Sequence, residues 1–358
     1  MINTAMAYNF IPTSVKDIAA AKLKTGAVLI ALYDYIVKKV PNAKAPLAID
    51  KAKPNSVKIV RALNGTVSVN ELKKIAPGIT LSWGNGSRGG SGAANKGIGF
   101  ERDLETDLIA YREEGISSDR IKAKTFLVDL EQYYGLENAK SIEVKSEGAL
   151  NKRRPLTFMG NQPIISGGGT DFNVGSTVTD LTLMKDGKPI YLSLKYGATV
   201  TFFNIGVSTI LKPTEINHGM ISDLNGVSLL NMFGIDNMKF CRVFTEHGSK
   251  NGSEEVVDVT GKINRQALTT FIMSGVGYGY HLVHKVGSQI HHFEMTKGKL
   301  QKACTPNQVT VRYPYGTAKR VDVTVTTPVF QLKINIRNKQ GGLYPTHVMA
   351  DYKIVGHP

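Results

Sequence analysis

Asp180, Ser193 and Lys195 are three polar residues whose types and spacing could act together on a phosphate group. A carboxylate such as Asp180 can hold a divalent cation. A lysine beside it can orient a water molecule or stabilise the negative charge that develops on a phosphate. This chemistry requires the fold to bring all three side chains to one face.

A β-hairpin is predicted to do so. Its turn is Asp186-Gly187, because Asp-Gly between two alternating runs is a strong signal for a two-residue turn in which both residues have positive φ. Facing residues lie equally far from the turn, so we expect Asp180 across from Ser193 and Lys195 on the same face. The other face is apolar and consists of Leu181, Leu183, Leu192 and Leu194. An ordinary amphipathic hairpin with a solvated polar face is the alternative.

A predicted helix before the hairpin carries two more carboxylates, Glu101 and Glu105. Its apolar stripe consists of Phe100, Leu104, Leu108 and Tyr111. Glu101 and Glu105 are four residues apart and lie together beside that stripe. Carboxylates in such positions are usually solvated, so the pair indicates little by itself.

Taken in order, these residues resemble the PD-(D/E)XK nuclease superfamily, which has the restriction-endonuclease-like fold. Asp180, the hairpin and Ser193-Leu194-Lys195 are similar to its signature, and Ile98-Gly99-Phe100-Glu101 is similar to the start of the helix that lends a Glu to the metal. Ser193 departs from the usual Glu, and Thr179 departs from the usual Pro. The resemblance implies an α/β fold with a mixed central sheet flanked by helices.

The resemblance also implies a phage-encoded, metal-dependent DNA endonuclease that hydrolyses phosphodiester bonds with Mg²⁺ or Mn²⁺. The metal ligands would be Asp180, Glu101 or Glu105, and the backbone carbonyl of Leu194. Lys195 would orient the attacking water or offset charge, and Ser193 would contact the metal through water. The alternative is a non-catalytic DNA-binding or structural virion protein that retains the fold, which the charge lost at Ser193 favours.

The composition favours a polyanionic partner. Lys and Arg number 44 against 29 Asp and Glu, which gives a net charge of +15 and favours DNA through phosphate contacts. Two basic patches are predicted to contact DNA: Arg88 and Lys96 in the glycine-rich segment 84–99, and Lys152, Arg153 and Arg154. A plain mobile loop is the alternative for segment 84–99, and a nucleotide-binding loop is disfavoured because GxxxxGK[ST] is absent.

Other features narrow the class of protein. The two cysteines, Cys241 and Cys304, provide neither a disulfide framework nor a thiolate zinc site, and they fit a reducing compartment. The longest apolar run, 27–33, is too short to span a bilayer. We therefore expect no membrane partner and an intracellular location, in the cytoplasm of an infected bacterium. A homodimer is expected because two strands must be cut.

Three regions are expected: a helical and mixed region 1–83, a nuclease-like core 84–250, and a β-rich domain 251–358. Predicted helices cover 15–40, 68–76, 100–115, 120–134 and 222–233, and segment 199–211 is expected to become a helix that backs the sheet. Predicted strands cover 56–63, 77–83, 141–144, 239–244, 308–313, 319–326 and 329–337, with an irregular loop at 160–169. Five histidines are expected at the surface or in packing positions rather than in a zinc site: His281, His284, His291, His292 and His347.

Overall fold

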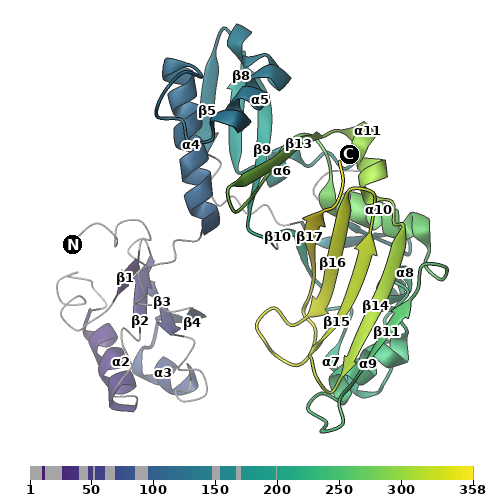
Figure 1. Ribbon diagram of the computed structural model, residues 1–358. Coiled ribbons are helices and arrows are strands. Elements are labelled where there is room, and N and C mark those ends of the chain that lie inside the picture. Colours follow the sequence, from purple (N-terminus) through teal and green to yellow (C-terminus); the bar gives the residue numbers. More distant parts are fainter. Residues whose placement is uncertain are drawn as a thin grey trace. The chain divides into compact units, whose positions relative to one another are not determined.

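The computed structural model describes residues 10–12, 26–39, 47–50, 53–60, 69–84, 96–146, 154–166, 171–198 and 200–357. The chain divides into two compact units, Met1–Lys96 and Gly97–Pro358 (Figure 1). Helices and sheets mix in both units, as the sequence predicts for an α/β protein.

The first unit contains a four-stranded sheet in the order β1-β2-β3-β4. Its elements are β1 (Phe10–Pro12), α2 (Gly26–Lys39), β2 (Leu47–Asp50), β3 (Lys53–Val60), α3 (Val69–Ile75) and β4 (Thr80–Gly84). Strands β3 and β4 are parallel, and α3 lies between them in the chain. Leu29, Leu32 and Ile36 follow one face of α2 and are fully buried in the core of this unit. The predicted helix 15–40 is confirmed over α2, and its beginning lies outside the described residues.

The second unit begins with the sheet that carries the predicted hairpin. This sheet has the order β13-β12-β9-β8-β5. Its strands are β5 (Ile142–Ser146), β8 (Leu181–Lys185), β9 (Lys188–Tyr196), β12 (Tyr280–Val286) and β13 (Gln289–Met295). Neighbouring strands are antiparallel except β9 and β12, which are parallel. The sheet is therefore mixed, as expected.

Two helices cover the apolar face of this sheet, α4 (Lys96–Glu114) and α5 (Lys124–Tyr134) (Figure 1). The predicted stripe of α4 packs there: Phe100, Leu104 and Leu108 share one buried cluster with residues of the hairpin. The hairpin contributes Leu181, Leu183 and Leu192, each with no exposed surface. A short 3-10 helix, Leu136–Asn138, follows α5.

A second, six-stranded sheet is antiparallel throughout and has the order β10-β17-β16-β15-β14-β11. Its strands are β10 (Val200–Gly206), β11 (Ser253–Asp258), β14 (Gln308–Tyr315), β15 (Arg320–Thr326), β16 (Phe330–Arg337) and β17 (His347–Ile354). The predicted strands at 308–313, 319–326 and 329–337 are thus confirmed. A separate hairpin joins β6 (Leu156–Met159) to β7 (Gln162–Ile165).

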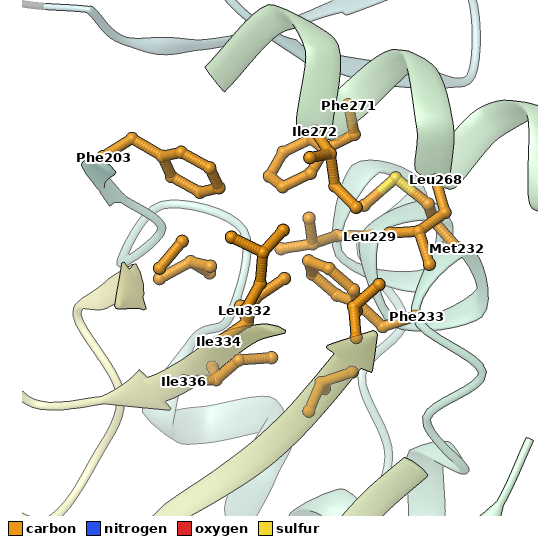
Figure 2. Packing of buried hydrophobic residues seen from close by; sticks show 14 of the residues in the cluster. Phe203, Leu229, Met232, Phe233, Leu268, Phe271, Ile272, Leu332, Ile334 and Ile336 are labelled. Carbon is orange, nitrogen blue, oxygen red and sulfur yellow. The ribbon is translucent and has the colours of Figure 1, made fainter. Parts of the chain in front are cut away.

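One large core joins this sheet to the remaining helices, which are α6 (Gly175–Val178), α7 (Pro213–Asn217), α8 (Leu224–Met232), α9 (Asn237–Thr245), α10 (Arg265–Val276) and α11 (Lys297–Cys304). Figure 2 shows Phe271 of α10 and Phe233, just after α8, facing Leu332 of β16. Tyr280 and Leu282 from the five-stranded sheet belong to the same core. Residues 97–358 therefore form one unit, whereas the sequence suggested a boundary near residue 250. Both cysteines are buried and unpaired.

Three local predictions are wrong. Segment 239–244, predicted as a strand, lies in α9, where Asp236 caps the helix by accepting the N–H of Lys239. Its buried residues, Phe240, Cys241, Val243 and Phe244, have helical rather than alternating spacing. Segment 199–211, predicted as a helix, contains β10, which pairs with β17. The predicted loop 160–169 contains β7.

Candidate active site

The β8–β9 hairpin has the predicted register and turn. Leu181 faces Leu192 and Lys185 faces Lys188, so the two-residue turn is Asp186-Gly187. Both turn residues have positive φ, 49° at Asp186 and 77° at Gly187. Asp180 lies one residue before β8, and its N–H donates to the carbonyl of Leu192 at 2.9 Å, so the predicted pair of Asp180 with Ser193 is not part of the ladder. This register places Asp180 beside the end of β9 that carries Lys195.

Asp180 and Lys195 lie together at that end of the sheet. The Lys195 Nζ is 4.0 Å from the Asp180 Oδ2. The same oxygen accepts the backbone N–H of Leu194 at 2.7 Å. Both side chains are largely covered, with 35% of Asp180 and 21% of Lys195 exposed. The carboxylate is therefore fixed by the backbone of the strand that positions the lysine.

Glu101 is the third charged group of the site. Burial raises its pKa, and the negative charges of Asp180 and Glu105 raise it further, so Glu101 is within electrostatic reach of Asp180. Packing fixes this end of the helix, because the Phe100 ring lies 6.2 Å from that of Tyr196 and the Lys285 Nζ lies 5.3 Å from the Phe100 centroid. Two carboxylates far apart in the sequence therefore interact electrostatically, and a shared role in metal binding stays a prediction.

Burial in the site disfavours the charged forms of Asp180 and Lys195. Burial raises the pKa of Asp180, and Lys195 and the Leu194 N–H partly offset that rise. Burial lowers the pKa of Lys195, and Asp180 partly offsets that fall. Two carboxylates that repel each other would be stabilised by a bound cation, and a lysine with a lowered pKa can give up its proton. Such shifts are typical of functional sites.

Ser193 is on the predicted face, but it is not at an open surface. Only 1% of Ser193 and 3% of Thr182 are exposed, so the polar face of the hairpin is covered rather than solvated. In the register of β12, Ser193 pairs with Leu282, a residue of the large core. The solvated-hairpin interpretation is therefore wrong, and the proposed water-mediated contact of Ser193 with a metal stays a prediction.

The donor set can be tested against a divalent cation. Within the described residues, no three His, Cys, Asp or Glu side chains form a group that could hold a metal ion. Mg²⁺ usually takes only one or two protein carboxylates and completes its shell with waters and phosphate oxygens. Asp180 and Glu101 fit that requirement, with Glu105 next to Glu101 on the same helix face. The carbonyl of Leu194 stays a predicted ligand.

The structure describes only some of the residues that are predicted to contact DNA. Arg88, Lys152 and Arg153 lie outside the described residues, and Lys96 is the first residue of α4. Arg154 is half-buried and has partners within the protein, and its contact with DNA stays a prediction. Its guanidinium donates to the carbonyls of Ser274 and Gly275 at the C-terminal end of α10, so this arginine caps a helix.

Asp171, another carboxylate that precedes the hairpin in the chain, has hydrogen-bond partners of its own. Its Oδ2 accepts the Tyr278 hydroxyl at 2.9 Å and its Oδ1 accepts the Asn173 N–H at 3.3 Å. These bonds lower the pKa of Asp171. It therefore stabilises the loop before α6.

The sequence interpretation missed a polar chain between α5 and the β12–β13 hairpin. Asp129 accepts from His292 Nε2 at 3.0 Å, His292 Nδ1 is 3.1 Å from His281 Nε2, and His281 Nδ1 is 3.0 Å from the Tyr134 hydroxyl. Because a carboxylate only accepts, each group donates toward Asp129 when both histidines are neutral. The alternation of polar and apolar residues on both sides of Gly287-Ser288 is a sequence signal for the β12–β13 hairpin.

Comparison of the chain with protein-family models, curated proteins and solved structures found no match. The functional conclusion below therefore depends on the residues and their geometry. Among the helices in the described part of the chain, none is long and apolar enough to cross a membrane.

Proposed function

We propose that this chain is a metal-dependent DNA endonuclease of the PD-(D/E)XK type. The observation that supports the proposal is that Asp180, just before β8, and Lys195, near the end of β9, lie 4.0 Å apart with both side chains largely covered. Glu101 on α4 is within electrostatic reach of Asp180. Two carboxylates can hold a metal ion and a lysine can orient the attacking water, so this set of groups could support metal-assisted hydrolysis of a phosphodiester.

The surrounding fold supports the proposal. The three antiparallel strands β5, β8 and β9 are followed, after α10, by β12, which runs parallel to β9. Helices α4 and α5 cover one face of this mixed sheet, and the core that contains α10 covers the other. We propose that these elements form a restriction-endonuclease-like core.

The residues of the chain would divide the chemistry between them. Asp180 and Glu101 would hold Mg²⁺ or Mn²⁺, which when bound polarises the phosphate and lowers the pKa of a bound water. The Lys195 Nζ lies 4.0 Å from the Asp180 Oδ2 and would orient the attacking water, and its lowered pKa would favour accepting a proton. Leu194 would fix the Asp180 oxygen through its N–H.

DNA is the proposed substrate because the chain carries a net charge of +15. Excess cations attract the phosphate backbone without regard to sequence, and this attraction weakens as salt displaces the bound counterions. A homodimer is proposed because two strands must be cut. An intracellular, phage-encoded role belongs to the same proposal.

A non-catalytic DNA-binding or structural protein is the second candidate. The buried Ser193 favours it, because this serine stands where the nuclease superfamily usually has a glutamate. A site with one carboxylate fewer binds a divalent cation less strongly. A protein could then keep the fold and the positive charge without the reaction.

Cleavage of supercoiled, linear and branched DNA distinguishes the two candidates. We expect cleavage with Mg²⁺ or Mn²⁺ and none with EDTA, and Asp180→Asn should abolish most of it. Asp119→Asn is the matched control, because Asp119 is an exposed aspartate on the loop between α4 and α5. DNA binding without metal-dependent cleavage of any of these substrates would favour the non-catalytic protein.

A further inference from the structure

A buried histidine beside Lys195 contacts a buried tyrosine that comes from the other sheet. His284 on β12 is 3% exposed and Tyr352 on β17 is 1% exposed. The parallel pairing of β12 with β9 places His284 directly beside Lys195. The rings of His284 and Tyr352 meet edge to face with centroids 5.3 Å apart. The six-stranded sheet therefore reaches the neighbourhood of the candidate active site.

His284 makes one hydrogen bond, and that bond determines its tautomer. Its Nε2 lies 2.7 Å from the carbonyl oxygen of Gly197. A carbonyl oxygen only accepts, so Nε2 carries the proton and Nδ1 of the neutral ring is an acceptor. Burial lowers the pKa of His284, the bond to Gly197 partly offsets that fall, and His291 and Lys195 add to it, so the neutral ring is favoured. The bond holds the chain two residues after Lys195.

The other polar atoms of this pair are not satisfied. Neither His284 Nδ1 nor the Tyr352 hydroxyl has a hydrogen-bond partner among the described residues. Buried polar groups are nearly always bonded, and leaving one unpaired is unfavourable. If these two residues served only to pack the core, apolar rings would do so without leaving buried polar atoms unpaired. The two atoms are also complementary, because the hydroxyl can donate and Nδ1 can accept.

We propose that His284 and Tyr352 are positioning residues that fix Lys195 in the candidate active site. His284 anchors the Gly197 carbonyl and so fixes the end of β9. Tyr352 packs edge to face against the ring of His284 from the six-stranded sheet. Its hydroxyl, which has no partner in the part of the chain that the structure describes, is proposed to donate to Nδ1 during the reaction. The effect on reaction rate rests on the proposed nuclease function, whereas the effect on the end of β9 does not.

Substitutions at His284 test the anchor to Gly197. His284→Gln keeps an N–H donor that can reach the Gly197 carbonyl, whereas His284→Asn is too short and His284→Leu has no donor. In single-turnover cleavage with Mg²⁺ we expect His284→Asn and His284→Leu to lower the rate by up to about 10²-fold. This is the scale of a small misplacement of a catalytic group. DNA affinity should not change. His284→Gln should stay within about threefold of the wild-type rate, because rescue requires only the donor.

Tyr352→Phe tests the hydroxyl. It removes a buried group without a partner, so stability should stay equal or rise while the cleavage rate falls. A purely structural tyrosine would show the opposite, a loss of stability without a specific effect on rate. Phe202→Leu is the matched control, because Phe202 stacks on the Tyr352 ring at 3.8 Å without contacting His284 in any described aromatic pair. A wild-type rate in Tyr352→Phe would overturn the role of its hydroxyl.

Amide hydrogen exchange of residues 195–198 provides a readout that does not depend on cleavage. His284→Leu and His284→Asn should speed exchange there by roughly tenfold or more, and His284→Gln should not, because only Gln keeps the bond to Gly197. If the wild-type protein cleaves no DNA but exchange follows this pattern, the nuclease proposal fails and the positioning of β9 stands. If DNA is cleaved while neither rate nor exchange changes in His284→Leu and His284→Asn, the positioning proposal is overturned and the nuclease stands.

Discussion

At the scale of single residues, the candidate site is a set of charges that the fold makes unfavourable. Asp180 and Glu101 have raised pKa values and Lys195 has a lowered one, and burial is the largest cause at each. The spacing of these residues in the sequence predicts which face of the hairpin or helix each one occupies. It could not predict the burial of Ser193, because that depends on β12 and on the core behind it.

His281 should make the stability of the protein depend on pH. Burial lowers its pKa in the folded protein to about 3, from a usual 6.5. The unfolded chain therefore binds a proton that the folded chain does not, so the stabilisation is complete above about pH 6.5 and is lost as pH falls toward 3. Between about pH 6.5 and 5 we expect a loss of about 2 kcal/mol in the free energy of unfolding.

Urea unfolding at these two pH values checks this prediction. His281→Gln cannot titrate, so its free energy of unfolding should fall less with pH than that of the wild-type protein. His291→Gln is the control, because His291 is the exposed neighbour of His292 on β13. Equal pH dependence in the wild-type protein and His281→Gln would contradict the assignment.

At the scale of elements, the sequence predicts correctly the turn and the helix whose structure depends on residues close together in the chain. The turn at Asp186-Gly187 and the stripe from Phe100 to Tyr111 were predicted because glycine-containing turns and apolar spacing act over a few residues. Segments 199–211 and 239–244 were assigned wrongly because short apolar runs fit a strand and a helix equally well. Their structures depend on distant partners, β17 for β10 and the core helices for α9.

Asp186 should stabilise the hairpin through both its backbone and its side chain. Its Oδ1 accepts the N–H groups of Lys140 and Ser141 at 2.8 and 2.9 Å, which connects the turn to the start of β5. Asp186→Ala removes this acceptor and leaves alanine at a positive φ, so we expect a loss of about 1–2 kcal/mol. Asp186→Asn keeps one acceptor and tolerates the φ, and it should lose less. The denaturant midpoint of unfolding measures the stability of both variants. An unchanged midpoint in Asp186→Ala would contradict a stabilising role of Asp186.

At the scale of the whole molecule, residues 97–358 form one unit with a shared core. The boundary near residue 250 is inferred from a change in strand pattern, but β10 pairs with β17 across it, and β9 pairs with β12 across it. Composition along the chain cannot show which strands pair across long separations. The separate unit 1–96 has a buried cluster of its own.

Leu332→Ala tests this division. Leu332 is fully buried between β16 and the helices, and its truncation should cost about 2–5 kcal/mol in the second unit. The only tryptophan, Trp83, is in β4 of the first unit. Circular dichroism should therefore report an earlier transition in Leu332→Ala, while the tryptophan fluorescence transition stays where it was. A joint shift of both signals would contradict two independent units.

The most direct test of the account is a double-mutant cycle on single-turnover DNA cleavage with saturating Mg²⁺. Asp180→Asn and Lys195→Ala should each lower the rate by roughly 10²-fold or more, because each removes one electrostatic stabiliser. The two residues lie 4.0 Å apart and act as a unit, so the double variant should be little slower than either single variant. Full activity in Asp180→Asn, in a protein that remains folded, would show that this hairpin is not the active site.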